Sequence, residues 1–219
     1  MTGLGARPVG PQEAAEEWRL FIAVPVPAGI RDDVARIVAD LRPLAPRARW
    51  QSADTWHLTL KFLGQTPARE VPRLGEILRS LASSTRPFRT ELRDAGSFGG
   101  GRRPLVAWIG VGAGSDRLAA LAESLDRAID PNGDNHPLRA HLTVAREAPP
   151  ELVGALREVM AGGPRLAWTS DRVVLYRSVL GPRGSTHTEL VSAPLGGDEV
   201  GGDEVVSDMA GSATVSSGR

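Results

Sequence analysis

Two short stretches of the chain carry the same side chains at the same spacing: His57-Leu58-Thr59-Leu60 and His141-Leu142-Thr143-Val144. The chain has only four histidines, and two of them begin these tetrapeptides. Each tetrapeptide lies in a run that alternates polar and apolar residues, which is typical of a half-buried strand. In such a strand the imidazole and the hydroxyl two residues later share one face, about 6.5–7 Å apart along the chain. Two strands of this kind facing each other would surround a cleft with groups suited to acid–base chemistry on a phosphate.

The repetition of the pattern carries more weight than either copy alone. A single histidine in a strand is most often a surface or structural residue, but two copies with threonine at the same offset are hard to obtain by chance. The 84 residues between the copies leave room for a similar folding unit around each. Strict alternation predicts that Lys61 shares the face of His57. It places Arg146 on the apolar face, unless Arg146 lies past the end of its strand.

These motifs resemble those of the two-histidine phosphoesterase superfamily. Their surroundings are similar to the RNA 2′,3′-cyclic phosphodiesterases, historically called 2′-5′ RNA ligases. The resemblance extends over roughly 18–190, and its matching segments are Arg19–Val24 (RLFIAV), His57–Gly64 (HLTLKFLG), Leu138–Arg146 (LRAHLTVAR) and Leu175–Leu180 (LYRSVL). Two positions depart from the family pattern. Ala140 precedes the second motif, where the family usually has proline, and His187 stands where an aromatic residue, often tyrosine, is expected.

The resemblance implies a role for each of the four motif residues. His141 would be the base that takes a proton from water, and His57 the acid that protonates the departing 3′-oxygen. Thr59 and Thr143 would donate hydrogen bonds to the non-bridging phosphate oxygens. The residues by themselves support a two-histidine mechanism, because the ordinary pKa of histidine lies near neutral pH. They do not say which ring is the acid.

Basic and aromatic residues near the motifs are candidates for contact with RNA. Lys61 is the only lysine of the chain, and it either meets the phosphate backbone or is simply solvated. Arg139 flanks the second motif, and Arg146 matches the arginine that follows this motif in the family. Weaker candidates are Arg49 and Arg183 for the backbone, and Trp50, Trp56 and Phe98 for stacking on a base.

No metal and no cofactor are expected. The chain has no cysteine and no His-Glu-x-x-His pattern, and neither His136 nor His187 has neighbours typical of metal ligands. The sequence predicts hydrolysis of RNA 2′,3′-cyclic phosphate ends to 2′-phosphomonoesters. Two alternatives stay open: 2′-5′ RNA ligation, and a non-catalytic module of the same fold that binds RNA or nucleotides.

Composition agrees with a cytoplasmic protein, and we expect a monomer. No 18-residue apolar run and no signal peptide are apparent in the sequence. Five acidic residues lie in 191–219 and three in 1–17, against one arginine in each segment. The remaining residues, 18–190, keep 24 basic and 18 acidic side chains, a net charge of +6. A modestly basic centre suits a polyanionic substrate.

The composition of both ends of the chain predicts tails that flank one domain. We expect a flexible extension over 1–17, a two-lobed phosphoesterase domain over 18–193, and a disordered tail over 194–219. The C-terminal segment contains the tandem repeat GGDEVGGDEV and almost no large apolar residues, so it has little to bury.

Between the tails, periodicity predicts an α+β fold. Expected helices are 29–41, 67–81, 115–129 with Ser115 as N-cap, and 150–160. Expected strands are 18–24, 49–51, 56–63, 88–95, 105–111, 140–145, 166–170, 172–180 and 186–191, with a glycine-rich loop over 96–103. The family resemblance implies two pseudo-symmetric lobes, whose antiparallel sheets flank a central groove with helices packed outside.

Overall fold

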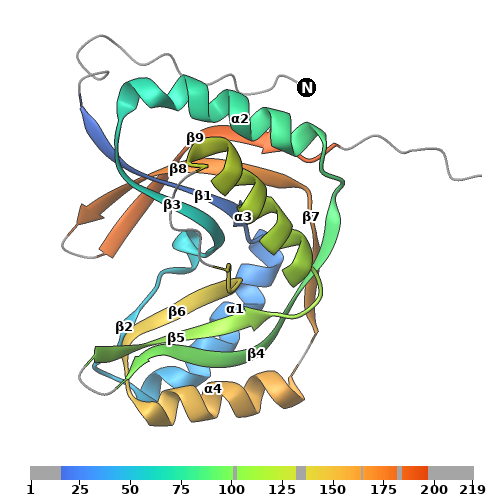
Figure 1. Cartoon of the computed structure of the whole chain (residues 1–219). Helices are drawn as coiled ribbons and strands as arrows, with labels where there is room; N and C mark the ends of the chain where they lie inside the picture. Colours follow the sequence, from blue (N-terminus) through green and yellow to red (C-terminus); the bar gives the residue numbers. More distant parts are fainter. Residues whose placement is uncertain (1–15, 101–102, 132–136, 164, 182–183, 197–219) are drawn as a thin grey trace, which may run out of the picture.

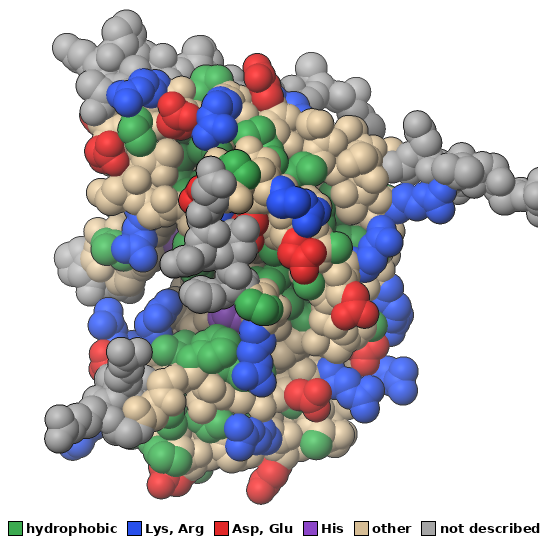
Figure 2. All heavy atoms as spheres, viewed as in Figure 1, with side chains coloured by type: hydrophobic (Ala, Val, Ile, Leu, Met, Phe, Trp, Pro, Cys, Tyr) green, Lys and Arg blue, Asp and Glu red, His purple; other side chains and the backbone are tan. Residues whose placement is uncertain are grey.

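The computed structural model describes residues 16–100, 103–131, 137–163, 165–181 and 184–196. Within these residues the chain forms two antiparallel sheets with helices packed on their outer faces (Figure 1). Figure 2 shows that the surface is hollowed between the two halves, and histidine side chains are visible in this hollow. The α+β fold predicted from the sequence is therefore confirmed, with one sheet in each half.

Each sheet contains one of the two motif strands. The first sheet has the order β3 (His57–Pro67), β1 (Glu17–Pro25), β8 (Arg172–Gly181) and β9 (Gly184–Pro194). The second has the order β2 (Arg49–Trp50), β6 (His141–Ala148), β5 (Arg103–Val111), β4 (Phe88–Gly100) and β7 (Leu166–Ser170). His57 begins β3 and His141 begins β6, so the two histidines occupy equivalent positions in the two sheets.

Four α-helices cover the sheets: α1 (Ala28–Leu41), α2 (Val71–Ser83), α3 (Ser115–Ile129) and α4 (Pro150–Gly162). Short 3₁₀ turns occupy Arg42–Leu44, Ala53–Thr55 and Ala68–Glu70. Helices α2 and α3 pack on the first sheet, whereas α1 and α4 pack together beside the second (Figure 1). No helix in the described ranges is long and apolar enough to cross a bilayer.

The element order repeats. Apart from the two-residue strand β2, the unit β1–α1–β3–α2 is matched later in the chain by β5–α3–β6–α4, and the motif strand comes third in each. In both units the first helix crosses over: α1 leaves the first sheet and packs against β7 and α4, and α3 leaves the second sheet and packs against β3 and α2. This exchange joins both sheets and all four helices in one hydrophobic core, which holds the two motif strands in a fixed relation.

Strand β1 shows how the two faces of the first sheet are used. Its Leu20, Ile22 and Val24 enter the main core. The alternate residues Phe21 and Ala23 face the other way, where they form a smaller buried cluster with side chains of β8. This second face is the one that carries His57, because the ring of Phe21 lies 4.7 Å from that imidazole, measured between centroids.

Two local predictions were wrong. The segment expected as a glycine-rich loop continues β4 as far as Gly100, because Ser97 and Phe98 pair with β5, while Gly99 and Gly100 adopt positive φ values of 90° and 117° that glycine tolerates. Ser115 is the first residue of α3 rather than its cap. The N-cap is Gly114, with a left-handed φ of 87° and no room for a Cβ, which would lie 2.5 Å from the carbonyl oxygen of Arg89.

The folded segment extends slightly past both boundaries expected from the sequence. Glu17 already belongs to β1, and the side chain of Glu16 accepts a hydrogen bond from the indole of Trp18. At the other end Leu195 is buried in the core, and its backbone N–H donates to the carbonyl oxygen of Asp171. The rest of both expected tails, 1–15 and 197–219, lies outside the described residues.

Candidate active site

His57 lies in an aromatic surrounding on the inner face of the first sheet. Its ring contacts the rings of Phe21 at 4.7 Å, His187 at 5.3 Å and Tyr176 at 6.2 Å, measured between centroids. Phe21 and Tyr176 are themselves stacked. Three strands, β1, β8 and β9, therefore fix the orientation of the imidazole that begins β3.

His141 has a smaller aromatic surrounding on the second sheet. Phe98 meets it edge to face at 4.8 Å, and Trp108 lies at 6.3 Å. The indole of Trp108 fits because its neighbour on β4 is Gly96, where a Cβ would come within 2.4 Å of the ring. A glycine in the interior of a strand often marks such a close approach.

Both histidines are held by the same hydrogen bond. Nδ1 of His57 donates to the carbonyl oxygen of Thr55, and Nδ1 of His141 donates to the carbonyl oxygen of Arg139, each at 2.7 Å. A carbonyl oxygen only accepts, so Nδ1 carries the proton in both neutral rings. This leaves Nε2 as the nitrogen that exchanges a proton with a substrate. Thr59 and Thr143 are partly exposed two residues along each strand, on the side of the histidine.

Each motif strand contains a β-bulge directly after its threonine. On β3, Ala23 lies opposite Thr59 and Ile22 opposite Lys61, so Leu60 is an extra residue. On β6, Trp108 lies opposite Thr143 and Ala107 opposite Ala145, which makes Val144 the extra residue. A bulge of this kind turns two successive side chains to the same side and shifts the alternation by one residue.

The bulge corrects the expectation for Lys61. Alternation placed Lys61 on the face of His57, but Lys61 lies opposite Ile22, on the helix side of the sheet, where its ammonium group forms an ion pair with Asp126 of α3. Both side chains are largely buried. The next residue, Phe62, returns to the inner face, where its ring lies 6.3 Å from that of Phe21.

The corresponding bulge in β6 brings Arg146 to the site. Arg146 does not lie past the end of its strand, as one reading of the sequence required. It stands within β6, opposite Val106, on the face that carries His141. Arg139 approaches from the segment before β6, and its guanidinium lies 4.6 Å from the centroid of the Trp108 ring. Both arginines are close enough for their charges to lower the pKa of His141.

The pKa values of the two rings are both lowered. Burial lowers the pKa of His57 to about 4, and the charges that His187 and His141 acquire on protonation act in the same direction. Burial is also the main cause of the lowered pKa of His141. In the free protein both imidazoles are therefore neutral near pH 7. A bound phosphate would raise both values, because a nearby negative charge favours the protonated ring.

The remaining candidates separate into residues near the site and residues away from it. Of the aromatics, Phe98 contacts His141, whereas Trp56 is buried in the core and Trp50 donates to the carbonyl oxygen of Ala45. Arg49 pairs with Glu147 at 3.4 Å. His136 and Arg183 lie outside the described residues. In the part of the chain that the structure describes, no three side chains of histidine, cysteine, aspartate or glutamate gather in a metal-binding arrangement.

The sequence left three neighbours of His57 without a role: Phe21, Tyr176 and His187. Phe21 and Tyr176 lie in RLFIAV and LYRSVL, two segments that resemble the family. This resemblance was the signal in the sequence that could have indicated a place near the site. His187 lines the same side of the site, and its Nδ1 is buried without a hydrogen-bond partner within the described residues. Its pKa is lowered by burial as well.

The comparisons with known proteins agree on one family. The model of the 2′-5′ RNA ligase superfamily matches residues 27–182. The RNA 2′,3′-cyclic phosphodiesterase of Methanothermobacter thermautotrophicus is 32% identical over 184 residues, which cover 78% of this chain and 96% of that protein. The enzyme of the same name from Thermus thermophilus is 31% identical over 191 residues, covering 82% and 91%.

Solved structures match over most of the chain too. The crystal structure of TT0787 from Thermus thermophilus has a TM-score of 0.68 at 28% identity and covers 82% of this chain and 99% of that one. Escherichia coli LigT complexed with 3′-AMP has a TM-score of 0.66 at 27% identity, with coverage of 82% and 99%.

Proposed function

Because the chain belongs to the 2′-5′ RNA ligase superfamily, we propose that it hydrolyses RNA 2′,3′-cyclic phosphate ends to 2′-phosphomonoesters. The observation that supports this most directly is the pair of histidines at equivalent strand positions, each with Nδ1 held by a backbone carbonyl. Both rings leave Nε2 free for the substrate, so a neutral ring and a protonated partner on the two sheets would give one proton acceptor and one proton donor. The relatives named RNA 2′,3′-cyclic phosphodiesterase support the substrate class.

The proposed reaction opens the five-membered ring of the cyclic phosphate. Nε2 of His141 takes a proton from water, the water oxygen attacks phosphorus, and the bond from phosphorus to the 3′-oxygen breaks. Nε2 of His57 gives its proton to that oxygen, so the product has a free 3′-hydroxyl and a 2′-phosphate. The assignment of acid and base follows the family resemblance. In the free protein the pKa of His57 is lowered to about 4, so His57 gains its proton together with the negatively charged substrate.

Three kinds of residue assist this chemistry in the proposal. The hydroxyls of Thr59 and Thr143 donate hydrogen bonds to the non-bridging oxygens, where charge builds during attack. Arg146, on the face of His141, and Arg139, above the Trp108 ring, supply positive charge for the phosphate and the RNA backbone. Lys61 is left out, because its ammonium group is engaged with Asp126.

The direct test uses the pure protein and an oligonucleotide that ends in a 2′,3′-cyclic phosphate, incubated with EDTA. We expect hydrolysis at an unchanged rate in the chelator. Loss of activity in EDTA that divalent ions restore would contradict the metal-free mechanism. Adding an oligonucleotide with a 5′-hydroxyl separates the alternatives: a joined product would indicate 2′-5′ ligation, and binding without turnover would indicate a non-catalytic module.

A further inference from the structure

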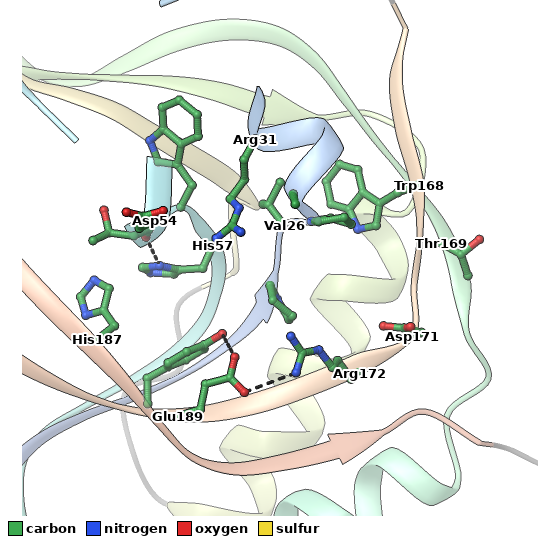
Figure 3. A pocket seen from close by; sticks show the side chains of 16 residues that line it. Val26, Arg31, Asp54, His57, Trp168, Thr169, Asp171, Arg172, His187 and Glu189 are labelled. Carbon is green, nitrogen blue, oxygen red and sulfur yellow. Dashed lines mark hydrogen bonds and ion pairs between the residues drawn. The ribbon is translucent and has the colours of Figure 1, made fainter. Parts of the chain in front are cut away.

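A cleft of about 400 Å³ lies beside His57 and is not used by the chemistry described above (Figure 3). Its walls come from the start of α1, the segment before β3, the end of β7, and strands β8 and β9. His57 and His187 line it, whereas His141 does not. The volume is in the range of pockets that hold a small molecule. Whatever fills this cleft therefore lies next to the reacting phosphate, on the side of the first sheet.

Two guanidinium groups point into the cleft, Arg31 from α1 and Arg172 from β8 (Figure 3). Arg172 is partly compensated by Glu189 at 3.3 Å. Arg31 is half-buried, and no carboxylate of the described ranges lies within ion-pair distance of it. Burial and Glu189 raise the pKa of the Tyr176 hydroxyl, and the charges of Arg172 and Arg31 reduce this rise, so both guanidinium groups lie near that hydroxyl. Arg31 is therefore a partly buried cation without a counter-ion among the described residues, and an anion entering the cleft could pair with it.

The carboxylates around the cleft do not remove this positive charge. Asp54, Asp171 and Glu189 line it, but all three are exposed to solvent, where water and salt weaken their effect. Arg31 is more buried than these carboxylates, whereas the side chain of Arg172 (41% exposed) is about as exposed as that of Glu189 (44%), so the positive charge comes mainly from Arg31 and in part from Arg172. The first turn of α1 adds to them, since it contains no acidic residue and its N-cap, Pro27, makes no side-chain hydrogen bond. The interior of the cleft therefore favours a negatively charged group.

We propose that this cleft holds the phosphodiester that precedes the cyclic end of the RNA, with Arg31 as its main ligand. The inference rests on the proposed function. In an RNA end, one ribose separates the cyclic phosphate from the preceding phosphate. With the cyclic phosphate between His57 and His141, a second anion one nucleotide away enters the positive cleft that adjoins His57. The enzyme then selects the end of an RNA chain over a free cyclic mononucleotide.

The test compares three substrates: adenosine 2′,3′-cyclic phosphate, its 5′-phosphorylated form, and the dinucleotide ApA with a 2′,3′-cyclic phosphate end. We expect kcat/KM for the dinucleotide to exceed that for the unphosphorylated mononucleotide by about 10- to 50-fold, the size of a charge-assisted contact. Arg31→Gln should bring this ratio close to one. Arg36→Gln is the matched control, because Arg36 lies on the same helix but is exposed and paired with Asp33. Glu189→Gln should increase the ratio, since it frees Arg172.

Several results would overturn the inference. A wild-type ratio near one, or an equal loss on all three substrates in Arg31→Gln, would mean that the cleft does not bind the preceding phosphate. A preference for the 5′-phosphorylated mononucleotide alone would assign the cleft to a terminal phosphate instead of an RNA chain. If the wild type hydrolyses none of the substrates, the proposed function fails. Calorimetric affinities of wild type and Arg31→Gln for the dinucleotide and the mononucleotide then decide the inference separately.

Discussion

The two motif strands have the same backbone features, but their histidines lie in different environments. Both begin with a histidine held through Nδ1 by a carbonyl two residues earlier, and both have a bulge after the threonine. His57, however, lies among three aromatic rings, and the charges that add to the effect of burial on its pKa are those of His187 and His141. The charges of Arg139 and Arg146 act instead on the pKa of His141. The repeated backbone places the two imidazoles in equivalent positions, and the side chains around them give the two rings different electrostatic environments. Such a difference allows one ring to act as the acid and the other as the base at one phosphate.

The positions after the bulge show this division most clearly. Four residues after the histidine stands Lys61 in one strand and the buried Ala145 in the other. Five residues after it stand Phe62 and Arg146, both on the inner face. The first half therefore offers an exposed aromatic surface where the second offers a guanidinium. An RNA end, with bases on one side and phosphates on the other, matches such an unequal pair of walls.

The largest effect is expected from removing either histidine. His57→Ala and His141→Ala should each lower kcat by at least about 10²-fold, because each ring carries a separate proton transfer. The double variant should lose much less than the product of the two, as expected for residues that act as a unit. Steady-state kinetics measure the losses, and circular dichroism checks the fold. A wild-type rate in either single variant would remove that ring from the mechanism.

The two bulges predict that substitutions of Arg146 and Lys61 have opposite consequences for activity and stability. Arg146→Gln should lower kcat/KM by about 10- to 100-fold through a lost phosphate contact. Lys61→Met should leave kcat/KM nearly unchanged but lower the free energy of unfolding by about 1–3 kcal/mol, because Asp126 loses its partner while largely buried. Kinetics and urea unfolding of both variants give the comparison. The reverse result would place Lys61 at the substrate.

The lowered pKa values predict an acidic optimum for kcat/KM. The productive free enzyme has one ring protonated and one neutral, a state that exists between the two macroscopic pKa values. Since both values lie below 6.5, kcat/KM should peak below pH 6.5 and fall as the pH rises and the acid loses its proton. The kcat profile should lie at higher pH, because bound phosphate raises both values. A flat kcat/KM profile between about pH 5 and 9 would contradict two-histidine catalysis.

The smallest effect concerns His187, which has no counterpart beside His141 in the described part of the second sheet. Its charge is one of the causes that lower the pKa of His57. His187→Phe keeps an aromatic ring in place but removes the charge, so the pKa of His57 should rise. Titration of the imidazole signals by NMR measures the shift. Thr188→Val, at the next residue of β9, should leave it unchanged. An unchanged value in His187→Phe would assign the lowered pKa to burial and to the charge of His141.

The sequence predicted the motif strands and the helices because their signals are local. It did not predict the bulges, because only one of the two motif strands shows a break in its alternation of polar and apolar residues. Val144 and Ala145 are two successive apolar residues that break the alternation of β6, and they would have revealed the return of Arg146 to the inner face. In β3 the corresponding pair is Leu60 and Lys61. A lysine there looks like a regular polar position until Asp126, 65 residues away, is placed beside it.

The cleft beside His57 could not be predicted from the sequence either, because residues from distant segments form it. Arg31 follows Ile30 at the edge of the apolar stripe of α1, so its side chain looks like an ordinary surface arginine. Its place in a cleft depends on Arg172 and Tyr176, which come from β8 near the other end of the chain. Only the pairing of β1 with β8 brings these segments together. Local periodicity contains no information about such a contact.

The most direct test of unequal roles for His57 and His141 is the position of the product phosphate. ³¹P NMR of the product formed from ApA with a 2′,3′-cyclic phosphate end, in EDTA, distinguishes a 2′-phosphate from a 3′-phosphate. If His57 protonates the 3′-oxygen, the product is the 2′-phosphate with a free 3′-hydroxyl. A 3′-phosphate as the main product would show that the ribose binds in the opposite sense, and that the acid and base assignments of the two rings must be exchanged.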